Sequence, residues 1–331
     1  MKKFLGCLLF LSLSLNNLCL ASPAIYLFLD GGPAKNYESL LKNPKIKGAQ
    51  IIYRWKSLEP EKNVYDFSAI KNDLALLSSM HKSLFIQIQD RSFEPNDIPT
   101  PNYLLSNQYH GGVAKQVDFS GEGRPLSEGW VAKQWVPSVQ KRFQQLLLAL
   151  GKQFDGKIDG INLPETAIDL DQKQMPPDFT CQGYFNATIS NLKILRLSFK
   201  KSRVIQHINF FPCEWNNDHH YMNRLFDFAE KYKIGLGGPD VVPYRKGQMK
   251  NSYPFFHRYK GKLKTVAFSI QEPDYTYTNP KTGKHFTPED IYNFANHYLG
   301  ATILFWTIQE PEYSKKFLPF LKKLNEHKIK P

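Results

Sequence analysis

The chain has 331 residues, of which 42% are hydrophobic and 14% aromatic, and this composition excludes global disorder. Its formal net charge is +13, with Lys and Arg distributed over many segments. No RNA-binding motif or helix-turn-helix spacing accompanies these residues, so nucleic acid is not an expected partner. Solvated helix faces are the simpler interpretation of the charge, and attraction to an anionic surface or polymer is the alternative.

The first 21 residues have the layout of a secretory signal peptide. Lys2 and Lys3 precede an apolar run that ends near Leu15, and small residues lead to Ala21. Because that run is too short to span a bilayer, we expect cleavage after Ala21 and a secreted or periplasmic protein without stable membrane insertion. A retained membrane anchor is the alternative. The remainder, 22–331, is expected to form one catalytic domain, and its oligomeric state is left open.

Two cysteines, Cys181 and Cys213, remain once that segment is removed. In an exported protein such a pair is typical of a disulfide, which would close a loop between two distant segments. Two free buried thiols are the alternative.

Strand and helix patterns alternate along the rest of the chain, with helix or helix-compatible sequence after each strand. Eight strands are predicted, at 25–29, 48–55, 83–89, within 159–165, and at 203–209, 233–237, 264–270 and 301–307. Helices are predicted around 37–41, 66–80, 137–156, 184–200, 218–232, 247–259 and 287–300, with a Lys-rich helix at the end. Residues 92–136 interrupt this rhythm and are interpreted as a functional insertion.

The alternation favours an α/β protein with a parallel sheet covered by helices. Eight units at this length predict a closed (β/α)8 TIM barrel, with a long insertion between the third strand and the third helix. A doubly wound open sheet is the rival fold. It would need a glycine-rich first turn, and Gly31-Gly32-Pro33 is unsuited because Pro33 removes a phosphate-facing N–H.

Active sites of such barrels lie at the carboxyl ends of the strands. Glu165 follows the fourth predicted strand and Glu272 the seventh, so the two carboxylates would face each other across the barrel. Glycoside hydrolysis uses two carboxyl groups that flank the scissile bond. The other candidates at strand ends are Arg54, Asp90, Asn209, Asp240, Tyr244, Trp306 and Glu310.

These residues resemble those of clan A of the (β/α)8 retaining glycoside hydrolases, which includes cellulases, mannanases and β-galactosidases. The run from Tyr53 to Pro60 also looks like the second-strand segment of that clan. The resemblance implies that Glu165 is the acid/base and Glu272 the nucleophile. It further implies that Arg54 keeps the nucleophile ionised and that Trp306 forms a floor for the sugar.

Three further positions bear on this resemblance. The clan usually has Asn before the acid/base, but Pro164 stands there, so Asn162 or Asn209 would bind the sugar in its place. Tyr244 corresponds to the clan's Tyr beside the nucleophile. Glu310 shares the Ile-Gln-Glu-Pro pattern with Glu272 and is the alternative nucleophile, although the strand count favours Glu272.

The histidines match no strong zinc motif, so we expect neither a metal site nor a cofactor. The sequence thus predicts an exported glycoside hydrolase that cleaves a β-linked glycan by a retaining mechanism, with a carbohydrate as its substrate. The alternative is a non-catalytic glycan-binding TIM-barrel protein.

Overall fold

A computed structural model describes residues 22–119, 125–170 and 175–325. The predicted signal segment, 1–21, lies outside these residues. Within the part of the chain that the structure describes, no helix has both the length and the apolar character needed to cross a membrane.

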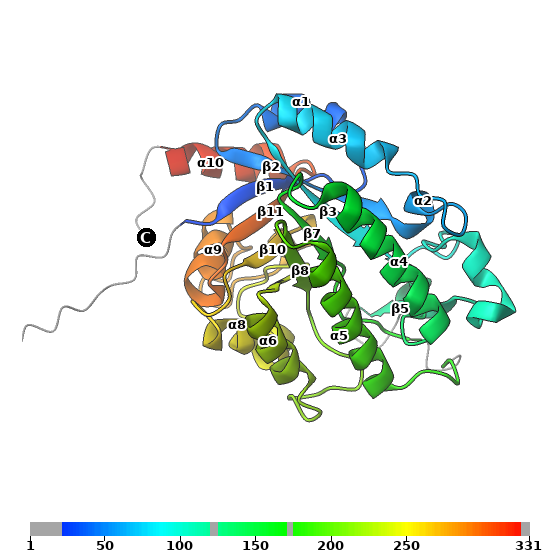
Figure 1. Cartoon of the computed structure of the whole chain (residues 1–331). Helices are drawn as coiled ribbons and strands as arrows, with labels where there is room; N and C mark the ends of the chain where they lie inside the picture. The colour runs from blue at the N-terminus through cyan, green and yellow to red at the C-terminus, as the bar shows by residue number, and fades with distance from the viewer. Residues whose placement is uncertain (1–21, 120–124, 171–174, 326–331) are drawn as a thin grey trace, which may run out of the picture.

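Eight parallel strands close into a barrel, which confirms the predicted TIM-barrel fold (Figure 1). Around the barrel the order is β1, β11, β10, β9, β8, β7, β3 and β2. The strands are β1 (Ala24–Phe28), β2 (Ile46–Arg54), β3 (Ser83–Gln89), β7 (Gly160–Leu163), β8 (Arg203–His207), β9 (Gly235–Gly238), β10 (Val266–Ile270) and β11 (Ile303–Thr307). Strands β7 and β10, which precede the two predicted catalytic residues, are separated by β8 and β9.

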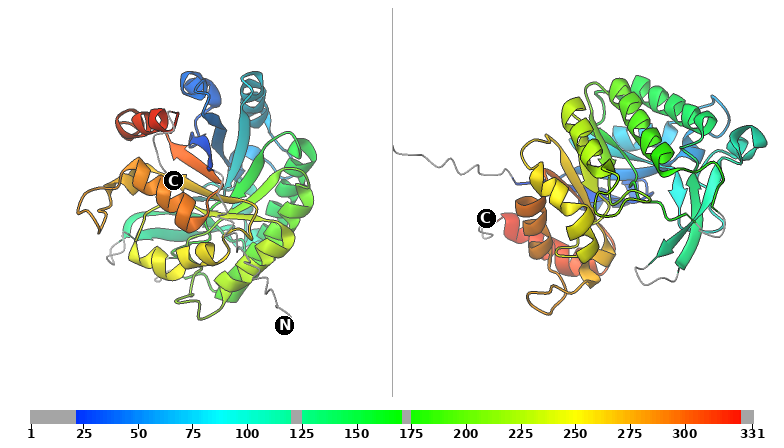
Figure 2. Two further views of the ribbon diagram at one scale, coloured as in Figure 1. Left: turned by 90° about the vertical axis from the view of Figure 1, so that its left-hand side faces the viewer. Right: turned by 90° about the horizontal axis from the view of Figure 1, so that it is seen from below.

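Helices surround the barrel on its outside (Figure 2). They are α1 (Glu38–Leu41), α2 (Trp55–Leu58), α3 (Ser68–Ser79), α4 (Pro137–Phe154), α5 (Cys181–Ser198), α6 (Tyr221–Tyr232), α7 (Lys246–Asn251), α8 (Tyr253–Arg258), α9 (Pro288–Asn293) and α10 (Leu318–Asn325). The predicted helix at 247–259 is divided into α7 and α8, because the chain bends at Ser252, where the helical hydrogen-bond pattern is interrupted.

The barrel interior is filled by an aromatic layer. The rings of Tyr26, Phe85 and Phe305 contact one another edge to face, with centroids 5.1–5.9 Å apart. Gly160 makes room for this layer, because a Cβ at that position would lie 2.2 Å from the Phe85 ring. The stacking of inward side chains in layers is the usual filling of such barrels, so the interior is a packed core rather than a channel.

A polar layer also occupies the barrel interior. The Gln50 side chain donates to Asn162 Oδ1 at 2.8 Å, and Asn162 Nδ2 donates to Gln87 Oε1 at 3.0 Å. All three side chains are buried. Their mutual hydrogen bonds remove the cost of burying amides, which would otherwise destabilise the fold.

The predicted insertion forms a small antiparallel sheet. Its strands are β4 (Arg91–Ser92), β5 (Val113–Phe119) and β6 (Pro125–Ala132), in the order β4, β6, β5. The β5–β6 hairpin projects from the barrel in the second view of Figure 2. Two contacts attach β5 to the loop after β7: the N–H of Val117 donates to the Asp169 carbonyl at 2.8 Å, and Gln116 pairs with Leu170. The insertion therefore supports the loop that carries Glu165.

Candidate active site

Glu165 is the second residue of the loop that follows β7, at the carboxyl end of the barrel. Arg91, which follows β3, donates to the carbonyls of Glu165 and Ala167 at 2.6 and 3.0 Å. The Gln206 side chain donates to the carbonyl of Pro164. Arg91 is itself buried and paired with Asp90, its Nε lying 3.1 Å from Asp90 Oδ1. The segment after β3 and the strand β8 thus determine the position of the loop that carries Glu165.

The electrostatic surroundings of Glu165 favour its protonated form. Protein atoms surround its carboxyl, and burial together with the nearby Asp240 carboxylate raises the Glu165 pKa to about 7. Arg91 and a hydrogen bond from Asn209 Nδ2, at 3.3 Å, oppose this rise. Part of the side chain still reaches solvent. A carboxyl with a pKa near neutrality, beside a second acid, has the properties of a general acid.

Two further carboxyl groups extend this cluster across β9 and β10. Burial raises the pKa of Asp240, which follows β9, and Arg245 opposes the shift. Asp274, which follows β10, is also buried, and burial with the adjacent Asp240 raises its pKa well above the usual range. The backbone N–H groups of Val241 and Gln271 donate to Asp274, both at 3.1 Å. Asp274 therefore joins the loop of Asp240 to the end of β10.

Glu272 begins the 3₁₀ turn Glu272–Thr276 directly after β10 and is partly exposed. In chain order β10 is the seventh strand of the barrel and β11 the eighth, as the sequence predicted. Glu272 forms no ion pair with any residue that the structure describes. Its position at a strand end matches the expectation, and its role as nucleophile stays a prediction.

The structure does not support the predicted role of Arg54. Its guanidinium is about half exposed and forms an ion pair with Asp97, in the segment that follows β4. The prediction that Arg54 keeps Glu272 charged is therefore wrong for this structure, because Arg54 contacts a different carboxylate. This carboxylate, Asp97, belongs to the insertion and lies 43 positions after Arg54, the last residue of β2.

Trp306 does not form a sugar-binding floor. Its side chain is 0% exposed, and its ring stacks on Phe317 with centroids 4.5 Å apart. Its indole N–H donates to the Tyr275 hydroxyl at 2.6 Å. The residue points outward, into the layer between β11 and the final helical segment, and so cannot touch a ligand.

The remaining predicted residues lie in different surroundings. Asn209 is brought to Glu165, whereas Asn162 is fully buried in the polar layer beneath it. Tyr244 is 38% exposed, and its hydroxyl accepts from Lys281 Nζ at 2.7 Å rather than contacting Glu272. Glu310 is exposed and accepts the N–H and hydroxyl of Ser314, so it caps the turn that follows.

Arg91 and Asp274 are the site residues that had not been assigned a role. Asp90 and Arg91 stand side by side at the end of the third predicted strand, and this charged pair could have indicated a role for Arg91. For Asp274 the signal was weaker, since it stands two residues after Glu272 in a run of polar and aromatic residues. Its importance comes from backbone groups of another loop, which no local pattern reveals.

A cavity of about 30 Å³ lies behind Glu165, between β7 and the helices α4 and α5. This is enough for one or two water molecules. Its lining includes Asp90, Arg91, Glu165, Gln134 and Tyr184. Among residues 22–119, 125–170 and 175–325, no group of three or more His, Cys, Asp or Glu side chains is arranged to hold a metal ion.

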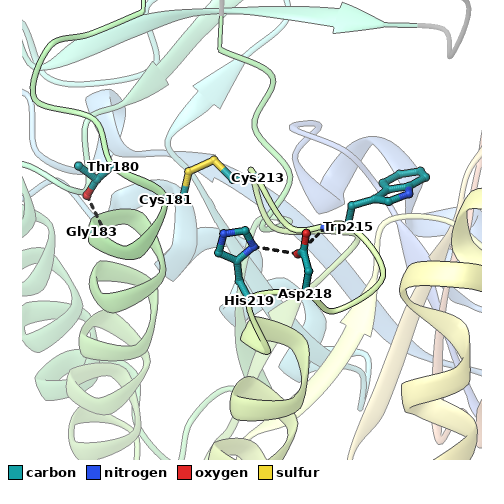
Figure 3. Close-up of a disulfide and its surroundings, with 7 residues drawn as sticks. All are labelled: Thr180, Cys181, Gly183, Cys213, Trp215, Asp218 and His219. Atoms are coloured by element: carbon teal, nitrogen blue, oxygen red, sulfur yellow. Dashed lines mark hydrogen bonds and ion pairs between the residues drawn. A yellow bond between two sulfur atoms is a disulfide. The ribbon is translucent and has the colours of Figure 1, made fainter.

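Cys181 and Cys213 form a disulfide, so of the two cysteine alternatives the bonded pair is the one observed (Figure 3). It joins the start of α5 to the loop after β8, across 32 positions of sequence. At the same end of α5, Thr180 accepts the N–H of Gly183 at 3.0 Å.

Replacing both cysteines, as Cys181→Ser with Cys213→Ser, is expected to lower the free energy of unfolding by about 3–4 kcal/mol on the loop-entropy model. Urea unfolding of the oxidised protein and the double variant measures the difference. Wild-type protein treated with a thiol reductant is the control and should match the variant. Equal stability of all three samples would contradict the prediction.

Comparison with solved structures finds the same fold in several enzymes. The catalytic domain of β-amylase from Paenibacillus polymyxa is 11% identical, covers 87% of this chain and 93% of its own, and has a TM-score of 0.55. A GH10 protein from Paenibacillus barcinonensis is 11% identical, covering 86% of this chain and 83% of its own, with a TM-score of 0.50. Xylanase 10B from Thermotoga petrophila RKU-1, solved with xylobiose, is 10% identical over 86% and 81%, with a TM-score of 0.50.

No family model and no curated protein matches the chain. Identities near 10% establish similarity of fold. The predicted resemblance to (β/α)8 glycoside hydrolases is therefore confirmed at the level of the barrel architecture.

Proposed function

We propose that this protein is an exported glycoside hydrolase that cleaves a β-linked glycan, with Glu165 as its proton donor. The observation that carries the proposal is the raised pKa of Glu165, about 7, at the carboxyl end of a barrel strand and beside a second carboxylate. A carboxyl in this state is protonated in about half of the molecules at pH 7 and can give that proton to a glycosidic oxygen. The disulfide and the signal-like N-terminus support export.

In the proposed retaining reaction, Glu272 attacks the anomeric carbon while Glu165 protonates the departing glycosidic oxygen. The C–O bond to the leaving group breaks and an ester bond to Glu272 forms. Glu165, now ionised, then takes a proton from water, which attacks the anomeric carbon and releases Glu272. The hydrogen bond from Asn209 stabilises the ionised form of Glu165 during this second step.

Asp240 is the second candidate for the partner carboxylate. Of the acids whose charge acts on Glu165, Asp240 has the largest effect, whereas Glu272 has no ion pair within the described residues. If Asp240 instead activates water for direct attack, the reaction inverts the anomeric configuration. The two assignments differ in stereochemistry, which can be measured.

Comparing Glu272→Gln with Asp240→Asn decides the assignment. Replacing the acid that attacks the anomeric carbon or activates water is expected to lower kcat by at least about a hundredfold. Asp240→Asn also removes a charge that raises the Glu165 pKa, so each variant is compared at its own pH optimum. There the variant of the other acid should keep most of the activity. Proton NMR of the first-formed anomer provides an independent check: retention goes with Glu272, inversion with Asp240. Full activity of the Glu272→Gln variant would eliminate Glu272 as the nucleophile.

The proposal itself is tested by reducing-sugar release from a panel of β-linked glycans, neutral and acidic. Hydrolysis of at least one member by the wild-type protein, lost in the Glu165→Gln variant, is the expected result. Binding without any hydrolysis would favour the alternative, a glycan-binding protein that has lost its chemistry. The exposed, differently paired Arg54 and the buried Trp306 are the observations that favour this alternative.

A further inference from the structure

The segment between Asp240 and Asp274 is strongly basic. From 241 to 271 the chain contains seven Lys or Arg residues and no Asp or Glu. Arg245, Lys246 and Lys250 of this segment follow β9, at the same end of the barrel as Glu165. The loop after β10 adds Lys281 and Lys284, again without an acid between 277 and 287. Positive charge therefore gathers beside the candidate site.

Three of these cations lie over aromatic rings. Lys250 Nζ is 4.9 Å from the centre of the Trp215 ring, and Lys281 Nζ is 4.4 Å from that of Tyr244. The Arg245 guanidinium lies 4.8 Å from the centre of the Tyr277 ring. The six residues come from the segments that follow β8, β9 and β10, which are neighbouring strands, and Lys250 lies in α7. We call this set the aromatic–basic rim.

The rim is accessible. Trp215 is 58% exposed and Tyr244 is 38% exposed. Lys250, Lys281 and Arg245 form no ion pair with a carboxylate of the described residues. Cations that stack on rings and lack a carboxylate partner keep N–H groups free for a ligand.

The backbone that carries Trp215 is held in place before any ligand binds (Figure 3). Two residues earlier, Cys213 is bonded to Cys181. The N–H of Trp215 donates to Asp218 Oδ1 at 2.9 Å, and the N–H of Asn216 donates to Asn251 Oδ1, on α7, at 3.2 Å. A platform fixed in this way loses little conformational entropy on binding.

We propose that the aromatic–basic rim binds a glycan carrying carboxylate or sulfate groups, so that the substrate is an acidic polysaccharide. This inference rests on the proposed function and names its substrate class. Flat rings pack on the apolar faces of sugars, while Lys and Arg bind the anionic substituents. The acids beside the rim are used differently: Glu165, Asp240, Glu272 and Asp274 belong to the candidate site, and Asp218 accepts from Trp215 and contacts His219.

Arg245 connects the rim to the chemistry. Its charge acts on both Asp240 and Asp274, so it lies at the boundary between the rim and the carboxyl cluster. One polysaccharide chain could thus place an anionic sugar unit at the rim and another unit at Glu165. The basic charge that the sequence left unexplained is in part a recognition surface for a polymer.

The experiment measures binding in the Glu165→Gln variant of the full chain, so that turnover does not consume the ligand. The probes are a carboxylated polysaccharide, alginate, a sulfated one, heparin, and neutral xylan, each at low and high salt. The test variant adds Lys250→Gln and Lys281→Gln. The matched control adds Lys42→Gln and Lys45→Gln, which remove the same charge at exposed positions before β2, at the opposite end of the barrel.

The rim variant is expected to bind the acidic probe roughly two- to thirtyfold more weakly than the control variant. Binding should also weaken as salt rises, because the contacts are between exposed charges. Equal affinity of the two variants would overturn the proposal, as would equal binding of xylan. Tighter binding of a DNA oligonucleotide or of anionic lipid vesicles, lost in the same variant, would also overturn it.

These results remain distinct from those on catalysis. Hydrolysis of neutral glycans alone, unaffected by the rim substitutions, would reject the rim and keep the hydrolase. Rim-dependent binding of an acidic glycan without hydrolysis by the wild-type protein would reject the hydrolase and keep the rim.

Discussion

The Glu165→Gln variant is expected to lose about 10²–10⁴-fold in kcat for glycan hydrolysis, the usual contribution of a positioned general acid. Gln has nearly the same shape as Glu and still accepts the hydrogen bond from Asn209, so the loop should keep its conformation. Initial rates on the best substrate of the panel measure the loss. Glu61→Gln, at an exposed position, is the control and should have wild-type rates.

The pH profile gives a second readout of the same residue. Because the acid must be protonated and its pKa is about 7, wild-type activity is expected to fall above pH 7, approaching tenfold per pH unit. This limb should be absent from the residual activity of Glu165→Gln. A wild-type profile that stays flat up to pH 9 would contradict the role of Glu165 as proton donor.

Glu165→Gln should also change stability, in the opposite direction from activity. The folded-state pKa of Glu165 lies above its ordinary value of 4.5, so its stabilising protonation is complete below about pH 4.5 and is lost as pH rises through 7. At pH 8 the wild-type protein keeps a buried charge that Gln lacks. The variant is therefore expected to be more stable by about 1–3 kcal/mol at pH 8 and to show little difference at pH 4.

The second large effect concerns a buried ion pair between α2 and α4. Glu59 is 0% exposed and is bonded to Arg142, whose guanidinium also donates to Asn63 Oδ1 at 2.8 Å. The other Glu59 oxygen accepts the Trp55 indole N–H at 2.9 Å. Arg142→Met leaves this carboxylate buried without its cation, so it is expected to cost about 3–5 kcal/mol of unfolding free energy.

Urea denaturation measures this cost. Lys141→Met, on the exposed side of the same helix, is the control and should change the unfolding free energy by less than about 0.5 kcal/mol. Adding Glu59→Gln to Arg142→Met should restore part of the loss, because the unpaired charge is removed with its partner. Additive losses in the double variant would show that the two residues act independently.

The barrel could be predicted from sequence because most strands contain a short apolar run and are bounded by turn residues. The same property hid the orientation of Trp306. Strands of a parallel barrel are buried on both faces, so Ile303–Trp306 is a continuous apolar run and gives no alternation that separates inside from outside. The hairpin of β5 and β6 was also missed, since its strands lie within a long Gly- and Pro-rich stretch.

Site residues could be predicted from sequence only where their position after a strand is enough to place them in the site. Glu165, Asn209 and Glu272 follow strands, and the topology brings those strand ends to the same end of the barrel. Arg54 was misassigned because its partner, Asp97, belongs to the insertion, whose path the sequence does not reveal. Asp274 acts through backbone groups of two loops, a relation that exists only in three dimensions.

Because of the bond between Cys181 and Cys213, the compartment in which the protein is produced determines the chemical state of the sample. In a reducing cytosol both thiols stay free, and the turn that presents Trp215 is then anchored only by hydrogen bonds. Recombinant material from the cytosol and from an oxidising compartment would be two chemically different preparations. Affinities measured on the first would describe a loop that can open.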